Sequence, residues 1–227
     1  MSDRQEELDI MTNDIFYQFY PPDEKLLQNS FLSIEFDQCI SMGMNCNSAS
    51  CLTESNNRHF KLPFDWMQAS ISNYRRMIQD MKNKNINCQV QLEPRVVLKH
   101  YDAWIPHEPN QNINEIEQNY IKYFNRLDKI LDHDERNNKN ICIVITSFDT
   151  LNKEIVQNYK ELLNEMYPRN NYFFLTCNFG EDPFVTHDHI NIVNKRIEGY
   201  HVEGKWIGNI YNKPLFHFFS TYVSSKK

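Results

Sequence analysis

The residue with the strongest sequence context for chemistry is Cys46, in the segment Ser41-Met42-Gly43-Met44-Asn45-Cys46. The apolar run from Phe36 to Met42 is typical of a buried strand, Gly43 closes it, and a helix is expected to begin near Asn45. A thiol at a helix N-terminus lies near unpaired backbone N–H groups, which stabilise the thiolate and could hold an oxyanion. The pattern predicts a nucleophile, with a buried packing role for Cys46 as the alternative.

A thiolate nucleophile needs a proton-transfer partner, and the chain has eight histidines. His100 follows the strand-like segment Val96-Val97-Leu98, which places it at a strand end. His59 is closer to the cysteine in the sequence and is the second candidate. Asp65, within Pro63-Phe64-Asp65-Trp66, is predicted either to orient the base or to cap the helix that follows, and the sequence favours neither.

Other chemistry finds little support in the sequence. The histidines and cysteine of the C-terminal third match no standard zinc spacing, although histidines two apart on a strand share a face. With five glycines and no glycine-rich phosphate loop, the chain does not favour a nucleotide cradle. We therefore expect neither a metal nor a cofactor; the metal candidates set aside are Cys177, His187, His189 and His201.

The bulk composition limits the classes of partner. A net charge of -6 without a basic stripe argues against nucleic acid and anionic membranes, and no apolar run is long enough to span a bilayer. The polar start resembles no signal peptide and the six cysteines form no CxxC pair, which favours free thiols in a reducing, cytoplasmic location. The expected partner is a protein, peptide or small-molecule substrate, and the oligomeric state is left open.

Strand-like and helix-like segments alternate along the chain. Residues 1–30 are predicted to form a polar leader, either flexible or packed on the domain, and residues 31–227 a single α/β domain. The alternation predicts a three-layer, mostly parallel sheet with flanking helices. Helices are expected at 70–81, 114–131 with Asn114 as N-cap, and 152–166; a strand pair at 90–98 and strands at 141–146, 172–177 and 189–193 complete the pattern.

With these segments in view, the chain resembles the DUF1796 family, whose proposed activity is that of a papain-like cysteine peptidase. The segment ending in Cys46 is similar to the family's S-L-G-x-N-C, and residues 63–66 match its P-F-D-W. Leu98-Lys99-His100-Tyr101 is similar to a strand ending in histidine, and Tyr123 with Arg126 resembles Y-x-x-R. Further along, Trp206-Ile207-Gly208-Asn209 resembles W-x-G-D, with Asn in place of Asp.

The resemblance implies a catalytic role for four residues. Cys46 would be the nucleophile, His100 the base, and Asp65 or Asn209 the group that orients the imidazole. The candidates for substrate binding are Asn45, Trp66 and Trp104. A papain-like α+β fold, with a helical domain against a β-barrel, is the alternative architecture.

The leading functional hypothesis is a thiol-dependent hydrolase or acyl transferase. The alternative is a non-enzymatic binding module, in which the loop of Phe64 to Trp66, together with Trp104 and the leader, forms a partner surface. A virus- or pathogen-type effector is a third interpretation, which the composition permits.

Overall fold

The computed structural model describes residues 34–43, 47–106, 108, 112–132, 138–147, 151–178, 184–193, 201–202 and 205–206. The predicted leader, residues 1–30, lies outside the described residues. Because of these gaps, every statement of absence below concerns only the described ranges.

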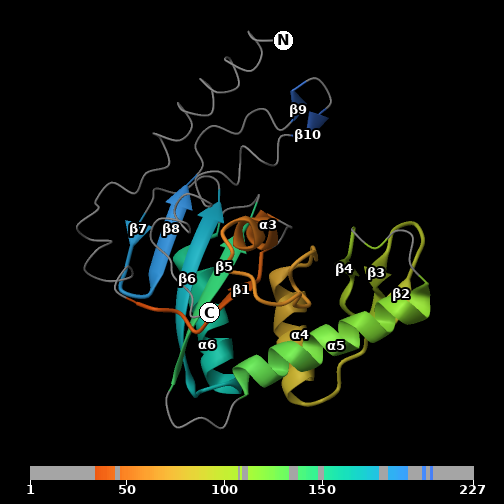
Figure 1. Cartoon of the computed structure of the whole chain (residues 1–227), viewed down its shortest axis with the longest axis horizontal. Helices are drawn as coiled ribbons and strands as arrows, with labels where there is room; N and C mark the ends of the chain where they lie inside the picture. The colour runs from red at the N-terminus through yellow and green to blue at the C-terminus, as the bar shows by residue number, and fades with distance from the viewer. Residues whose placement is uncertain are drawn as a thin grey trace.

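A five-stranded sheet forms the centre of the molecule, with the strand order β1-β5-β6-β8-β7 (Figure 1). The first four strands run parallel, and the short β7 pairs antiparallel at one edge. The two central strands are apolar and buried almost throughout, as expected of a parallel sheet that is covered on both faces. The strands are β1 (Gln38–Ser41), β5 (Lys139–Thr146), β6 (Asn170–Asn178), β7 (Phe184–Val185) and β8 (His189–Val193).

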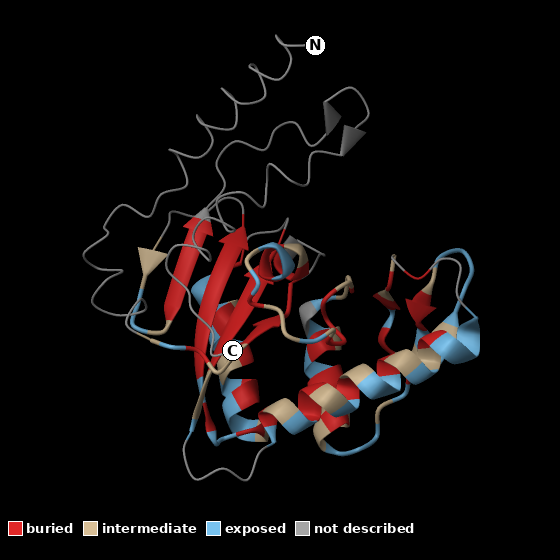
Figure 2. Ribbon diagram, in the orientation of Figure 1, coloured by how far each residue is buried: buried red, intermediate tan, exposed pale blue. Residues whose placement is uncertain are grey.

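Helices cover both faces of this sheet. On one face α4 (Ile71–Lys82), α5 (Ile113–Leu131) and α6 (Lys153–Met166) form the main core with residues such as Ile40, Ile143 and Phe174. The helix α3 (Asn47–Glu54) contacts β1 and β5 on the other face of the sheet, and its Cys51 lies near cysteines that point to that same face. Figure 2 shows the sheet strands largely buried, except for the half-buried edge strand β7, and the helices exposed on their outer sides. The predicted three-layer α/β fold is confirmed.

A small antiparallel sheet, β2 (Val90–Gln91), β3 (Val97–Leu98) and β4 (Ala103–Trp104), lies beside α5. The predicted strand pair within 90–98 is confirmed as β2 and β3. A short 3₁₀ turn, η1 (Lys99–Tyr101), joins β3 to β4 and carries His100. A second ladder pairs β9 (His201–Val202) with β10 (Lys205–Trp206). Among the described residues no β-barrel forms, so the alternative papain-like architecture is wrong for this part of the chain.

The helix caps differ from the sequence expectation at two places. Ser70 caps α4 by accepting a hydrogen bond from the Asn73 N–H at 3.3 Å, so Asp65 does not cap this helix. Asn112, rather than Asn114, caps α5. Asn152 caps α6, where the predicted helix began. No helix in the described ranges has the length and hydropathy that a bilayer crossing requires.

Candidate thiol site

The segment that carries the predicted nucleophile leaves the carboxyl end of β1 and enters α3. Gly43 is the last described residue before the turn, and Asn47 begins the helix. Cys46 itself lies outside the described residues, as do Asn45 and Asn209. The predicted strand and helix are confirmed as β1 and α3, and Cys46 directly precedes α3 in the sequence. The carboxyl ends of parallel strands are where α/β sheets commonly bind ligands.

Three buried hydroxyl side chains fix the start of α3 on the sheet. The Ser48 backbone N–H donates to Thr146 Oγ1 at 3.2 Å, and the hydroxyls of Ser41 and Ser48 lie 2.6 Å apart. All three side chains are fully buried. Since one of the first amides of α3 is already bonded to Thr146, an oxyanion at this helix end would rely on the remaining amides.

A buried tyrosine holds the other side of the turn. Tyr74, on the first turn of α4, donates its hydroxyl to the Gly43 carbonyl at 2.7 Å, with the Met67 carbonyl 3.4 Å away. Its ring packs edge-on against Phe64 at 5.0 Å between centroids. Burial raises the pKa of this phenol, so it stays a hydrogen-bond donor at neutral pH. Tyr74 falls within the helix predicted at 70–81, but the distant partner of its hydroxyl leaves no local signal in the sequence.

Asp65 is buried and bonded within its own loop. One carboxylate oxygen, Oδ2, accepts the Leu62 N–H at 2.7 Å and lies within 2.9 Å of two guanidinium nitrogens of Arg58. Burial raises the pKa of Asp65, while Leu62 and Arg58 counteract that rise. The guanidinium of Arg58 also lies over the ring of Trp66, 5.6 Å from its centroid. These contacts make Asp65 the anchor of the loop.

The same loop is held from α5 by the residues that resemble Y-x-x-R. Arg126 donates to the Lys61 carbonyl at 2.8 Å, and the Lys61 ammonium lies 5.1 Å from the Tyr123 ring centroid. Lys61 also pairs at 2.8 Å with Glu108, which is buried. The residues of α5 that resemble Y-x-x-R therefore pack against the loop that carries the P-F-D-W-like motif.

His100 lies against the exposed side of α4. Its Nε2 is 2.8 Å from a guanidinium nitrogen of Arg76 and 3.8 Å from Asp80 Oδ2. A guanidinium can only donate, so Nε2 accepts and the ring proton resides on Nδ1. About a third of the His100 side chain is exposed.

The contacts place His100 and the Gly43 turn on different sides of α4. Tyr74, which bonds Gly43, faces the core, whereas Arg76 is exposed and points about 200° away around the helix. Asp65 and His100 have different partners in the described residues. The predicted pairing of Cys46 with His100, and of Asp65 with His100, stays a prediction.

The two tryptophans proposed for substrate binding are half-buried, and each is covered by an arginine. Arg95 lies over Trp104 at 5.6 Å, as Arg58 does over Trp66. Backbone hydrogen bonds of 2.8 Å link Gln68 to Trp104, which brings the two loops together. Phe64, in contrast, is fully buried and belongs to the core rather than to a surface.

The five described cysteines and the imidazole of His189 are buried. Five cysteines are free and buried. Burial raises the pKa of the Cys51, Cys88 and Cys142 thiols, which leaves them poorly reactive. His189 lines a cavity beside α6 and bonds Thr176 at 2.8 Å, and burial lowers its pKa to about 4. No group of three or more metal-ligating side chains occurs in the described part of the chain.

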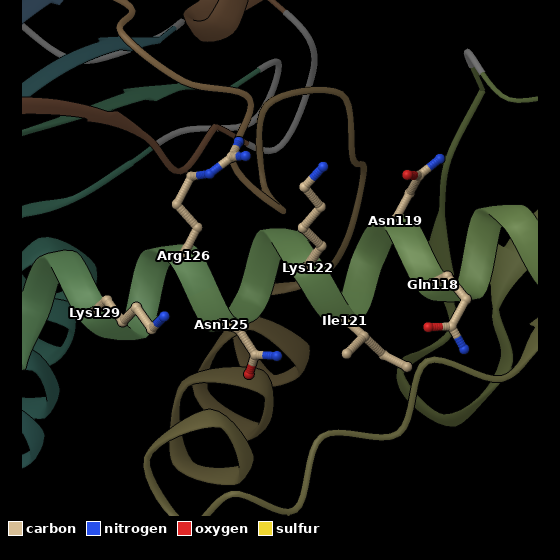
Figure 3. A pocket seen from close by; sticks show the side chains of 7 residues that line it. All are labelled: Gln118, Asn119, Ile121, Lys122, Asn125, Arg126 and Lys129. Carbon is tan, nitrogen blue, oxygen red and sulfur yellow. The ribbon is translucent and has the colours of Figure 1, made fainter.

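A surface groove runs along the outer side of α5, and neither the described cysteines nor His189 contribute to it. Figure 3 shows Lys122 and Arg126 extending from the same side of the helix. The groove measures about 620 Å³, and its described lining contains three cations and no acid. None of the predicted site residues contributes to that lining. The sequence, judged by composition alone, indicated no such basic strip.

Fold and site together define an α/β protein with a cysteine at the turn between the first sheet strand and the following helix. Over residues 37–169, more than half of the chain, the sequence matches the family model described as "Putative papain-like cysteine peptidase (DUF1796)". The chain belongs to the DUF1796 family. The match includes Cys46, Asp65 and His100 and ends before Asn209. No curated protein and no solved structure matches the chain.

Proposed function

We propose that this protein is a thiol-dependent hydrolase or acyl transferase with Cys46 as its nucleophile. The observation that carries the proposal is the position of Cys46 directly before α3, at the carboxyl end of a strand in a parallel sheet. In that position the helix dipole and unpaired amides favour a thiolate. The family's description as a cysteine peptidase is consistent with this chemistry.

In the proposed reaction the Cys46 thiolate attacks a carbonyl carbon. The leaving group then departs with a proton donated by the same group that acted as the general base. His100 is proposed as that base on the family pattern, with Asp65 or Asn209 to orient it. The described contacts of His100, with Arg76 and Asp80, add no support for this role. Trp66 and Trp104, with Asn45, are proposed to contact the substrate.

The nucleophile is tested by the pH dependence of alkylation. Iodoacetamide labelling, read by mass spectrometry, should modify Cys46 first, with a rate that rises through a pKa below that of free cysteine, about 8.5. Cys46→Ser removes the labelled site and serves as control. The proposal fails if Cys46 reacts no faster than free cysteine below that pKa.

The base is tested separately, with matched variants. His100→Gln retains an acceptor for Arg76, and His59→Gln is the corresponding change at the second candidate. If His100 is the base, only the first variant lowers hydrolysis of an activated thioester or peptide substrate. A full rate in His100→Gln removes His100 from the mechanism and leaves the nucleophile in place.

The binding-module alternative predicts the opposite result at the cysteine. A Cys46→Ala protein that keeps full biological activity would favour it. The burial of Phe64 reduces the aromatic surface that this alternative needs to Trp66 and Trp104. Five free buried thiols fit a reducing compartment, which stays a prediction.

A further inference from the structure

We infer that Tyr74 and Thr146 are positioning residues that hold the Cys46 turn from its two sides, an inference that rests on the proposed nucleophilic role of Cys46. Tyr74 bonds Gly43, three residues before the cysteine. Thr146 bonds the amide of Ser48, two residues after it. Four residues, 44–47, separate Gly43 from Ser48 in the sequence.

The Tyr74 hydrogen bond connects elements that are distant in the sequence. Its hydroxyl comes from α4, and the 2.7 Å bond reaches the carbonyl at the end of β1. The ring is fully buried and packs edge-on against Phe64 and Tyr159, and the shorter of the two hydrogen bonds of its hydroxyl is the one to Gly43. A hydroxyl held in this manner fixes the direction in which the chain leaves the strand.

Thr146 acts on the helix side of the turn. It ends β5, whose register with β1 is fixed by the pairing of Ser41 with Val144 and by the Met42 N–H bonded to the Val144 carbonyl at 2.9 Å. The side chain of Thr146 therefore meets the first turn of α3 from a rigid strand. By accepting the Ser48 amide, it aligns the helix axis, and so the helix dipole, with the residue that precedes the helix.

The consequence is a thiol whose reactivity depends on the hydroxyl groups of Tyr74 and Thr146, which bond Gly43 before it and Ser48 after it in the sequence. Helix-dipole effects of the usual size change the thiolate fraction roughly two- to fivefold, which equals an increase of about half a pH unit in the thiol pKa when alignment is lost. The loss should appear below the thiol pKa and vanish above it, because the fully ionised thiolate reacts in both proteins.

The experiment compares pH–rate profiles of Cys46 alkylation in the full chain. With little change of shape, Tyr74→Phe removes the hydroxyl that bonds Gly43, and Thr146→Val removes the hydroxyl that accepts from Ser48. Thr146→Ser keeps the acceptor and should react as the parent does. Tyr172→Phe is the control for tyrosine loss, since its buried hydroxyl also bonds a backbone carbonyl, that of Tyr167 at 3.1 Å, away from the turn.

The expected result is a profile displaced to higher pH in Tyr74→Phe and Thr146→Val, with an unchanged plateau, and no displacement in the two controls. If the parent thiol has a lowered pKa and neither variant displaces its pH–rate profile, the positioning inference is overturned and the proposed function is not. A parent thiol with an ordinary pKa refutes the proposed function, and the positioning role with it. Equal displacement in Tyr172→Phe reduces the effect to general loss of stability and also overturns the inference.

Discussion

Removing Arg58 should leave Asp65 as an uncompensated buried carboxylate. Asp65 exposes 2% of its side chain and Arg58 17%, so solvent screens the pair only slightly. Breaking a buried pair by removing one partner costs about 3–5 kcal/mol of unfolding free energy. Because Arg58 retains some exposure, we expect about 3 kcal/mol for Arg58→Met at neutral pH. The methionine conserves much of the aliphatic volume under Trp66.

The pH dependence separates this explanation from a simple loss of packing. Burial already raises the pKa of Asp65, and Arg58 is one of the groups that hold it down. Without Arg58 the folded-state pKa rises further above the unfolded value, so the folded protein binds the extra proton. Stability then increases as the pH falls through that raised pKa. The deficit of Arg58→Met should therefore shrink between pH 7 and about pH 5.

Urea denaturation of the parent, Arg58→Met and the double variant Arg58→Met/Asp65→Asn measures both effects. The neutral amide removes the stranded charge, so the double variant should recover more than about 1 kcal/mol relative to Arg58→Met at pH 7. An Arg58→Met deficit under about 1 kcal/mol, or one that does not change with pH, would refute the electrostatic reasoning. Asp65 would then be free for another role, including that of orienting a base.

Three further outcomes follow from the described contacts. In native protein, Ellman's reagent should titrate Cys46 rapidly and the five buried thiols only on unfolding; two or more fast thiols would contradict this. Ser70→Ala should lower the unfolding free energy by about 1 kcal/mol through loss of the α4 cap, whereas Asn114→Ala, outside the cap of α5, should cost less. Because burial lowers the His189 pKa to about 4, the unfolded chain binds its proton first, and stability should fall by up to about 3 kcal/mol as the pH drops from 6.5 to 4. A His189→Gln protein should lack that loss, and urea titrations at several pH values measure the difference.

The sheet was predictable because its signal is local. The run Ile141 to Ile145 is apolar at each position and buried on both faces, and the helices beside it show a regular apolar stripe. The helix caps were harder to predict, because Asn112 and Asn114 are equally good N-cap residues two positions apart. Asp65 was ambiguous for the same reason, and a better cap, Ser70, lies directly before the helix.

The contacts around the thiol turn were not predictable, since each joins residues far apart in the chain. Thr146 and Ser48 are 98 positions apart, and Tyr74 and Gly43 are 31 apart. Thr146 ends an apolar run, and Tyr74 lies on the apolar side of α4, so a pattern of hydrophobicity assigns both residues to the core. Only the fold shows that they meet the two ends of one turn.

The position of His100 in the sequence fits the order of the family motifs, but its contacts in the structure do not bring it to the turn. Its place at the end of a strand resembles the family pattern, yet its imidazole bonds the exposed face of α4, while Gly43, which precedes Cys46 in the sequence, is bonded from the buried face of the same helix. A helix with its side chains is about 10 Å across, so a base on the far side would have to reach around α4. The P-F-D-W-like loop, through Met67 and Tyr74, is the family motif that the described contacts bring to the turn. The place of that loop near Gly43, three residues before Cys46 in the sequence, is consistent with a positioning role that does not require Asp65 to contact an imidazole.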